Sequence, residues 1–361
     1  MRGHYDIALV VGLVTAGAGA IGCAGPTSPF GAINNFKFYA DYTPLRESKT
    51  PQSETKVIFE PERQVLHDKT QFSVLIEDPK GVPEEFSFQL TYNDLDVSEK
   101  FLGSASREYL DAEKTKLRLS SKNLRLLPGR DNRILASYQR TSEDKPLRVR
   151  YRPPRCNAFE REQLKSITGF PVDDETTQLI TKLARERDLN PNFVAALIAQ
   201  ESSFNPKALS VNRALGLTQI TPIGQTEILR RIPATLARYP GIDKMPLWKV
   251  KMDIMQGKIN AENEWRLNPK QSVAGGIEYL EFLKEYWDRP QKQELLSRYA
   301  PGLKRRRADL LLASYNSGAA RVSRAIETEG TRWLSSPDLR EARKYVWRIT
   351  SYCDHFNEVD K

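Results

Sequence analysis

Histidine, cysteine and long apolar runs are all scarce in this chain of 361 residues. Its three histidines are His4, His67 and His355, and none of them neighbours a serine or cysteine motif of a hydrolase. This scarcity argues against Ser-His-Asp or Cys-His catalysis, which needs an imidazole beside the nucleophile. The chain also lacks a glycine-rich phosphate loop and a zinc-type ligand spacing. We therefore expect no cofactor and no metal site.

The overall composition is that of a folded protein. Hydrophobic residues make up 39% of the chain and charged residues 28%, and the length is sufficient for two domains. No internal stretch approaches the ~20 apolar residues that span a bilayer. The formal net charge of +9 suits an acidic partner: nucleic acid, anionic lipid or anionic polysaccharide. Charge alone does not choose among these three.

The first 22 residues have the pattern of a secretory signal peptide. Arg2 and His4 precede a short apolar segment, which ends in the letters AIGC at residues 20–23. This ending resembles the lipobox of bacterial lipoproteins, with Ala where Leu is usual, and it implies a lipid anchor on Cys23. Under this resemblance, Ala24 rather than Asp after the cysteine implies the outer membrane of a Gram-negative cell, at its periplasmic face. Ordinary signal cleavage without lipidation is the alternative.

Two further cysteines, Cys156 and Cys353, remain in the exported chain. An oxidising compartment allows them to form a disulfide, which would join the start of the second domain to its last helix. A metal site is the rival, because Cys353, Asp354 and His355 are consecutive. Metal ligands are usually separated by two to four residues, so we expect the disulfide. Two free buried thiols are the other alternative.

The region from residue 34 to residue 151 alternates polar and apolar residues with a period of two, as half-buried strands do. Turn signals separate the segments, and the motif EDPKGV at 77–82 resembles bacterial immunoglobulin-like modules. We therefore predict an immunoglobulin-like β-sandwich over residues 23–152, with a flexible N-terminal tether. Such a domain could bind a protein partner or the glycan, or orient the rest of the chain. The expected strands are 71–77, 85–92, 114–119, 133–139 and 147–151.

Beyond a linker at residues 152–155 the apolar period becomes helical, so residues 153–361 are predicted to form a mainly α-helical domain. Asn-Pro pairs at 190–191 and 268–269 are typical helix starts, with a capping side chain followed by proline. Asp338 precedes the last helical pattern, which runs to His355. Gly275 and Gly276 lie within a predicted helix and indicate close helix packing there.

One carboxylate, Glu201, occupies an unusual place at the end of the helix that begins at Asn190. It lies four residues after Leu197 and three after Ile198, on the apolar side of that helix. Burial raises the pKa of a carboxyl group and keeps it protonated for general acid catalysis near neutral pH. The alternative is an ordinary glutamate on the solvated side of a helix end.

Four motifs follow one another in the second half of the chain. They are ESSFNPKALS at 201–210, GLTQ at 216–219, ASYNSG at 313–318 and EARKYV at 341–346. In this order they closely resemble the motifs of the soluble lytic transglycosylases. The resemblance covers about residues 176–355 and implies a lysozyme-like fold that acts on peptidoglycan.

The resemblance also implies roles for individual residues. Glu201 matches the catalytic acid and base of the family, and Ser210 matches a serine that contacts the N-acetyl group of the substrate. Tyr345 matches a tyrosine that lies near the catalytic glutamate. The residues that match the sugar groove of the family are Gly216, Gln219, Tyr315 and Asn316.

The chain departs from the family pattern in three places. Thr218 replaces the usual methionine, which would alter a sugar subsite, and Ser314 stands where the family has alanine. The connection between Gln219 and Asn268 is also longer than usual and contains Trp248 and Trp265. It could add a wall to the groove or simply pack against the domain.

The motif region offers a single acid. No Asp or Glu occurs from Ser202 to Thr226, whereas an ordinary glycosidase needs two carboxylates. The resemblance implies that the substrate's N-acetyl group participates and that a 1,6-anhydro end forms on N-acetylmuramic acid (MurNAc). A hydrolytic muramidase and a non-catalytic wall-binding scaffold lipoprotein are the alternatives.

The basic cluster at residues 304–307 is most simply a solvated helix end. Nucleic acid is not expected as a partner of an exported protein.

Overall fold

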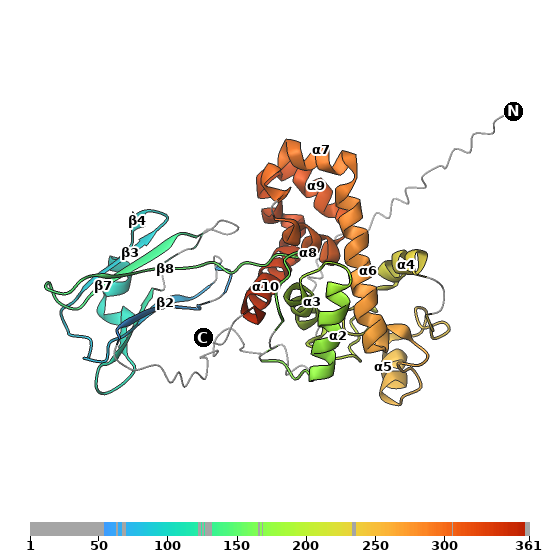
Figure 1. The fold of residues 1–361 in the computed structure, drawn as a ribbon, viewed down its shortest axis with the longest axis horizontal. Helices are drawn as coiled ribbons and strands as arrows, with labels where there is room; N and C mark the ends of the chain where they lie inside the picture. The colour runs from blue at the N-terminus through green and yellow to red at the C-terminus, as the bar shows by residue number, and fades with distance from the viewer. Residues whose placement is uncertain are drawn as a thin grey trace. The chain divides into compact units, whose positions relative to one another are not determined.

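The computed structural model describes residues 54–357, apart from 63, 67–69, 122, 123, 125, 127–131, 165, 166, 168, 233–235 and 305. The predicted signal peptide and Cys23 therefore lie outside the described residues, as does most of the tether. Figure 1 shows strands in the first part of the described chain and helices in the second. The domain boundaries at residues 23, 152 and 153 stay predictions.

The first part contains two antiparallel sheets of four strands each. Every predicted segment forms a strand, while β1, β4 and β5 are additional. The order in one sheet is β1 (Lys56–Glu60), β2 (Phe72–Glu77), β6 (Lys116–Ser121), β5 (Arg107–Tyr109); in the other it is β4 (Leu95–Asp96), β3 (Ser87–Tyr92), β7 (Ile134–Gln139), β8 (Leu147–Arg150).

Alternation along the strands produces the core of this part. In β6, Leu117 and Leu119 are fully buried, while Lys116 and Arg118, which alternate with them, are not. Leu90 of β3 and Ala136 of β7, from the other sheet, belong to the same hydrophobic cluster. A β domain with alternating strands is thus confirmed, whereas its immunoglobulin-like class stays a prediction.

The second part is mainly helical, as predicted. The predicted caps at Asn190 and Asn268 are confirmed: their side chains accept hydrogen bonds from the backbone N–H of Asn192 and Gln271, at 2.9 and 3.1 Å. The helices are α2 (Asp174–Arg185), α3 (Pro191–Ser202), α4 (Pro222–Arg231), α5 (Leu247–Met255), α6 (Pro269–Asp288), α7 (Pro290–Tyr299), α8 (Arg307–Ser317), α9 (Ala319–Glu329) and α10 (Arg340–Phe356).

Helix α3 lies in the core of this part and carries Glu201 near its end. All residues of α3 from Pro191 to Ala199 are buried. Helices α2 and α10 pack on either side of it (Figure 1). Burial on all sides explains why α3 is almost wholly apolar rather than amphipathic.

The two adjacent glycines of α6 allow close packing, as predicted. A Cβ atom at Gly275 would lie 2.4 Å from the ring of Trp265, and one at Gly276 would lie 2.5 Å from Thr218. Trp265 is therefore a core residue, with 0% exposure, whereas Trp248 is 69% exposed.

Within the part of the chain that the structure describes, no helix combines the length and apolarity that crossing a membrane requires.

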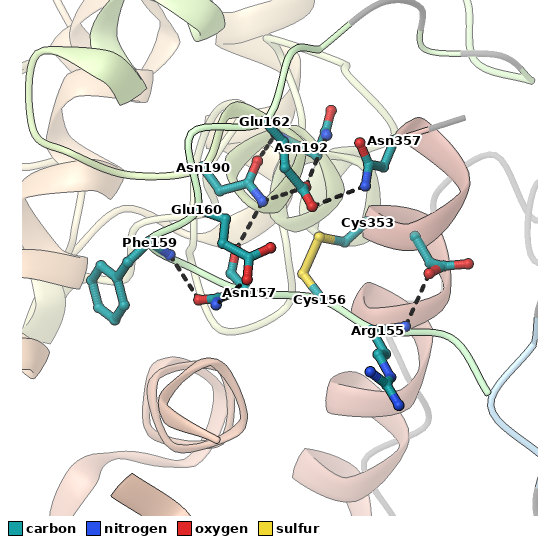
Figure 2. Close-up of a disulfide and its surroundings, with 11 residues drawn as sticks. Arg155, Cys156, Asn157, Phe159, Glu160, Glu162, Asn190, Asn192, Cys353 and Asn357 are labelled. Carbon is teal, nitrogen blue, oxygen red and sulfur yellow. Dashed lines mark hydrogen bonds between the residues drawn. A yellow bond between two sulfur atoms is a disulfide. The ribbon is translucent and has the colours of Figure 1, made fainter. Parts of the chain in front are cut away.

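A disulfide fastens the end of α10 to the segment that precedes α2. The sulfur atoms of Cys156 and Cys353 are 2.05 Å apart (Figure 2). Beside this bond, the carboxylate of Glu162 accepts hydrogen bonds from Asn190 at 2.6 Å and from Asn357 at 2.9 Å. The start of α3 and the end of α10 are thus tied together at one end of the helix pair.

Candidate active site

Glu201 lies in the last turn of α3, where the helix is forced to end. Ser203 adopts a left-handed conformation with φ of 51°, and its N–H donates to the carbonyl of Ala199 at 3.0 Å. Glu201 is a partly buried residue, whereas residues 191–199 before it are buried. Glu201 therefore lies where the buried part of the helix ends.

The surroundings of Glu201 favour its protonated form. Burial raises the pKa of this carboxyl group to about 7, and the hydrogen bond from Tyr345 lowers it by a smaller amount. No charged side chain of the described residues contributes to the shift. A carboxyl group with this pKa can both give up and recover a proton near neutral pH.

Tyr345 comes from α10, which packs along α3. Its side chain is buried, and its hydroxyl group donates a hydrogen bond to Oε1 of Glu201. Burial, and then the charge of Glu201, raise the pKa of Tyr345 well above its usual value. Tyr345 therefore keeps its proton and acts as a hydrogen-bond donor that orients the carboxyl group.

Tyr315 from α8 is a second neighbour of the carboxyl group. Burial, and then the charge of Glu201, raise the pKa of its hydroxyl group well above the usual value. This hydroxyl group donates to the backbone carbonyl of Thr218 at 2.7 Å. Tyr315 thus connects the catalytic candidate to the loop that carries the GLTQ motif. The next residue, Asn316, is exposed and accepts a hydrogen bond from Ser317 at 3.2 Å.

The GLTQ motif forms a tight turn. Gly216 has φ of +78°, and its N–H donates to the carbonyl of Ala208 at 3.0 Å. The side-chain amide of Gln219 donates to the carbonyls of Ala208 and Gly216, at 3.2 and 2.9 Å. Ser210 lies within the same loop, where its hydroxyl group accepts from the N–H of Ala214 at 3.0 Å. Side chains that match the sugar groove thus also hold their own loop in shape.

The structure therefore brings some predicted site residues together and leaves others apart. Tyr345 contacts Glu201 directly, Tyr315 lies within electrostatic range of it, and the turn from Gly216 to Gln219 is joined to Tyr315 through Thr218. Among the described residues, neither Ser210 nor Asn316 has a hydrogen bond to Glu201.

Thr218 has a different place from the one its motif suggested. It is only 1% exposed, and its hydroxyl group donates to the carbonyl of Ser272 at 2.8 Å. The side chain thus packs on α6 against Gly276 instead of forming part of a sugar subsite. The threonine and the glycine fit one another, because a larger residue at either position would push α6 away from the turn.

Two charged residues that support the turn were not predicted. Glu264 and Arg266 are both fully buried and form an ion pair of 2.8 Å. The backbone carbonyl of Arg266 lies so close to Gly216 that a Cβ atom there would be 1.7 Å from its oxygen. In the sequence they appear only as two opposite charges on either side of the apolar Trp265. Such a charge pair is also common on protein surfaces.

Comparison with known proteins agrees with the motifs. The family model described as "Transglycosylase SLT domain" matches residues 178–237 and 247–333. Membrane-bound lytic murein transglycosylase C of Actinobacillus pleuropneumoniae serotype 5b is 24% identical over 149 residues, which cover 41% of this chain and 32% of the relative. The protein of that name from Histophilus somni (strain 2336) is 23% identical over 151 residues, which cover 42% of this chain and 33% of the relative. The match thus spans about a third of each relative.

Solved structures give a weaker likeness. The 70 kDa soluble lytic transglycosylase from Escherichia coli has 19% identity and a TM-score of 0.33, covering 52% of this chain and 24% of that one. An inactive mutant of lytic transglycosylase Slt from Pseudomonas aeruginosa has 20% identity and a TM-score of 0.34, with the same coverage. These scores are too low to carry an argument. The family match thus places a region similar to the transglycosylase SLT domain in the helical part of the chain, over residues that include the first three motifs.

Proposed function

We propose that this protein is a peptidoglycan lytic transglycosylase that cleaves the β-1,4 bond between MurNAc and N-acetylglucosamine. The observation that carries the proposal is Glu201. Burial raises the pKa of its carboxyl group to about 7, and Tyr345 donates a hydrogen bond to it. No charged side chain among the described residues contributes to this shift. This environment suits one group that serves first as acid and then as base.

The reaction needs no second carboxylate. Glu201 gives its proton to the glycosidic oxygen as the bond to C1 of MurNAc breaks. The N-acetyl group of the substrate stabilises the positive centre at C1, steadied by Ser210. Deprotonated Glu201 then takes the proton of the C6 hydroxyl group, whose oxygen bonds to C1 and closes the 1,6-anhydro ring. Glu201 recovers its proton, and water is not consumed.

The products distinguish this proposal from its alternatives. The chain from Thr27 onward is incubated with purified sacculi, and the masses of the released muropeptides are measured. Anhydro ends support the proposal. Products heavier by one water would show a hydrolytic muramidase, and the absence of release would point to a wall-binding scaffold.

Replacing Tyr345 by Phe will shift the pH profile of the reaction. The hydrogen bond from Tyr345 lowers the pKa of Glu201, so its loss raises that pKa above the present value of about 7. Because Glu201 must begin protonated, activity falls as pH rises through its pKa, and this limb should move to higher pH in the variant. The rate at the optimum should fall ~10-fold, because the carboxyl group loses its orientation. An unshifted alkaline limb would contradict this role.

The N-terminal part supports a proposal about location. We place the protein at the periplasmic face of the outer membrane, anchored through a lipid on Cys23; the lipobox-like sequence and the relatives named as membrane-bound support this. Cys23→Ser should move the protein from the membrane fraction to the soluble periplasm, and unchanged membrane attachment would refute lipidation. The β part, which we take to be immunoglobulin-like, is the proposed place for a protein partner.

A further inference from the structure

Helix α5 exposes an apolar stripe to solvent. Trp248 is 69% exposed, Met252 44% and Met255 69%. These positions follow one another at intervals of four and three residues, so they share one face of the helix. The opposite face is anchored in the protein, because Val250 and Ile254 are buried in a cluster with Leu215 and other residues. The stripe is therefore held outward by a well-packed helix.

A stripe of this kind calls for an explanation in terms of binding. Single exposed apolar residues are common on protein surfaces, whereas contiguous ones mark surfaces that contact another molecule. Two of the three residues are methionines, which have flexible, polarisable side chains that adapt to irregular apolar surroundings. Methionine has no flat ring on which a sugar could stack, so a row of this composition does not suit a glycan strand.

Positive charge accompanies the stripe. Lys249 and Lys251 lie on the two sides of it, and residues 244–258 contain four lysines and one acidic residue. That residue, Asp253, is buried and pairs with Lys249 at 3.0 Å, so it is not on the outer face. An apolar stripe between lysines is complementary to a surface that is apolar inside and anionic at its rim.

We propose that α5 docks onto the surface of an anionic phospholipid bilayer. Trp248, Met252 and Met255 would enter the boundary between headgroups and acyl chains, where tryptophan is favoured. The lysines would reach the phosphates of the headgroups, with their aliphatic stems along the apolar face. Short amphipathic helices with an aromatic residue and flanking lysines bind membranes in this way.

The location of α5 gives this contact a consequence. Figure 1 shows α5 at the edge of the helical part, on the opposite side from α7 and α9. Its buried face belongs to the same hydrophobic cluster as Leu215, the residue before Gly216 of the GLTQ turn. Docking would therefore fix the direction in which that turn faces relative to the bilayer. The proposal concerns membrane binding alone and does not depend on the reaction proposed above.

Vesicle binding tests the proposal. The chain from Thr27 onward is suitable, because it retains all the residues that the structure describes and lacks the apolar signal segment. It should sediment with vesicles that contain phosphatidylglycerol and bind pure phosphatidylcholine vesicles much more weakly. The triple variant Trp248→Ser, Met252→Ser, Met255→Ser should bind the anionic vesicles at least ~10-fold more weakly.

Two further variants separate the contributions. Lys251→Gln should weaken binding ~5-fold, because one lysine near an anionic surface contributes about that factor. Ile223→Ser is the matched control: Ile223 is 81% exposed but lies on α4, so its loss should leave binding unchanged. Circular dichroism establishes that each variant is folded.

Three outcomes would overturn the proposal. The first is that the unaltered chain does not prefer anionic vesicles. The second is that the triple variant binds them as well as the unaltered chain does. The third is that the triple variant loses affinity for sacculi while it keeps its affinity for vesicles, which would make the stripe a glycan platform.

Discussion

Replacing Glu201 by Gln will reduce the release of muropeptides from sacculi by at least ~10³-fold. Glutamine has nearly the same shape and can still accept the hydrogen bond from Tyr345. It cannot give a proton to the glycosidic oxygen or remove one from the C6 hydroxyl group. Both steps are therefore lost with one substitution, whereas an enzyme with two carboxylates would keep the second group.

The same variant should be more stable than the unaltered protein at alkaline pH. The pKa of Glu201 is about 7 in the folded state against an ordinary value of 4.5, because burial opposes its charged form. The cost of charging buried Glu201 therefore destabilises the folded protein fully only above the folded pKa. Below the unfolded pKa the group is protonated in both states, and this cost is absent. The melting temperature of the variant, relative to the unaltered protein, should rise from about pH 5 to about pH 8.

Glu186→Gln is the control for this experiment. Glu186 is exposed at the end of α2, in the same helical part, so its replacement should change neither muropeptide release nor the pH dependence of stability. Activity of the Glu201 variant within tenfold of the unaltered protein would assign the catalytic proton to another group. A lost activity with a collapsed melting temperature would show instead that Glu201 is structural.

Local signals in the sequence predicted much of the fold. The cap at Asn190 acts within two residues of itself, and the alternation of Leu117 and Leu119 sets which face of β6 is buried. The last helix shows the limit of such signals. It begins at Arg340 and not directly after Asp338, because Pro337 opens a short 3-10 turn that includes Asp338.

In the candidate site, too, the residues set by local sequence were predictable and those set by distant contacts were not. Glu201 was predictable, since its place after Leu197 and Ile198 is a property of one helix. The support of its surroundings was not, because it depends on contacts across the chain. Thr218 meets Gly276, and Gly216 meets Arg266, at separations of 58 and 50 residues. A buried ion pair such as that of Glu264 and Arg266 has the same letters as an exposed one, so only the packing reveals it.

Replacing Gly216 by Ala will lower the free energy of unfolding of the helical part by ~3–5 kcal/mol, the range of severe backbone and packing defects. Two costs act together. A residue with a Cβ atom at φ of +78° is strained by ~1–2 kcal/mol. In addition, the new atom would lie 1.7 Å from the carbonyl oxygen of Arg266, which belongs to the backbone and cannot rotate away.

Gly241→Ala separates these two costs. Gly241 has φ of +73°, nearly the same conformation, but a Cβ atom there would meet nothing within 4 Å. It should therefore show the strain of ~1–2 kcal/mol alone. Denaturant unfolding followed by far-ultraviolet circular dichroism measures both variants. Equal losses for the two would mean that the contact between Gly216 and Arg266 does not constrain the turn.

The position of Gly216 also predicts an effect on activity that Gly241 does not share. Moving the turn away from Arg266 displaces the carbonyl of Thr218, to which Tyr315 donates its hydrogen bond. Tyr315 interacts electrostatically with Glu201, so the disturbance reaches the surroundings of the carboxyl group through Tyr315. At a temperature where both variants are folded, Gly216→Ala should therefore release muropeptides ~10–100-fold more slowly than Gly241→Ala, because catalysis depends on positions held to within about an ångström.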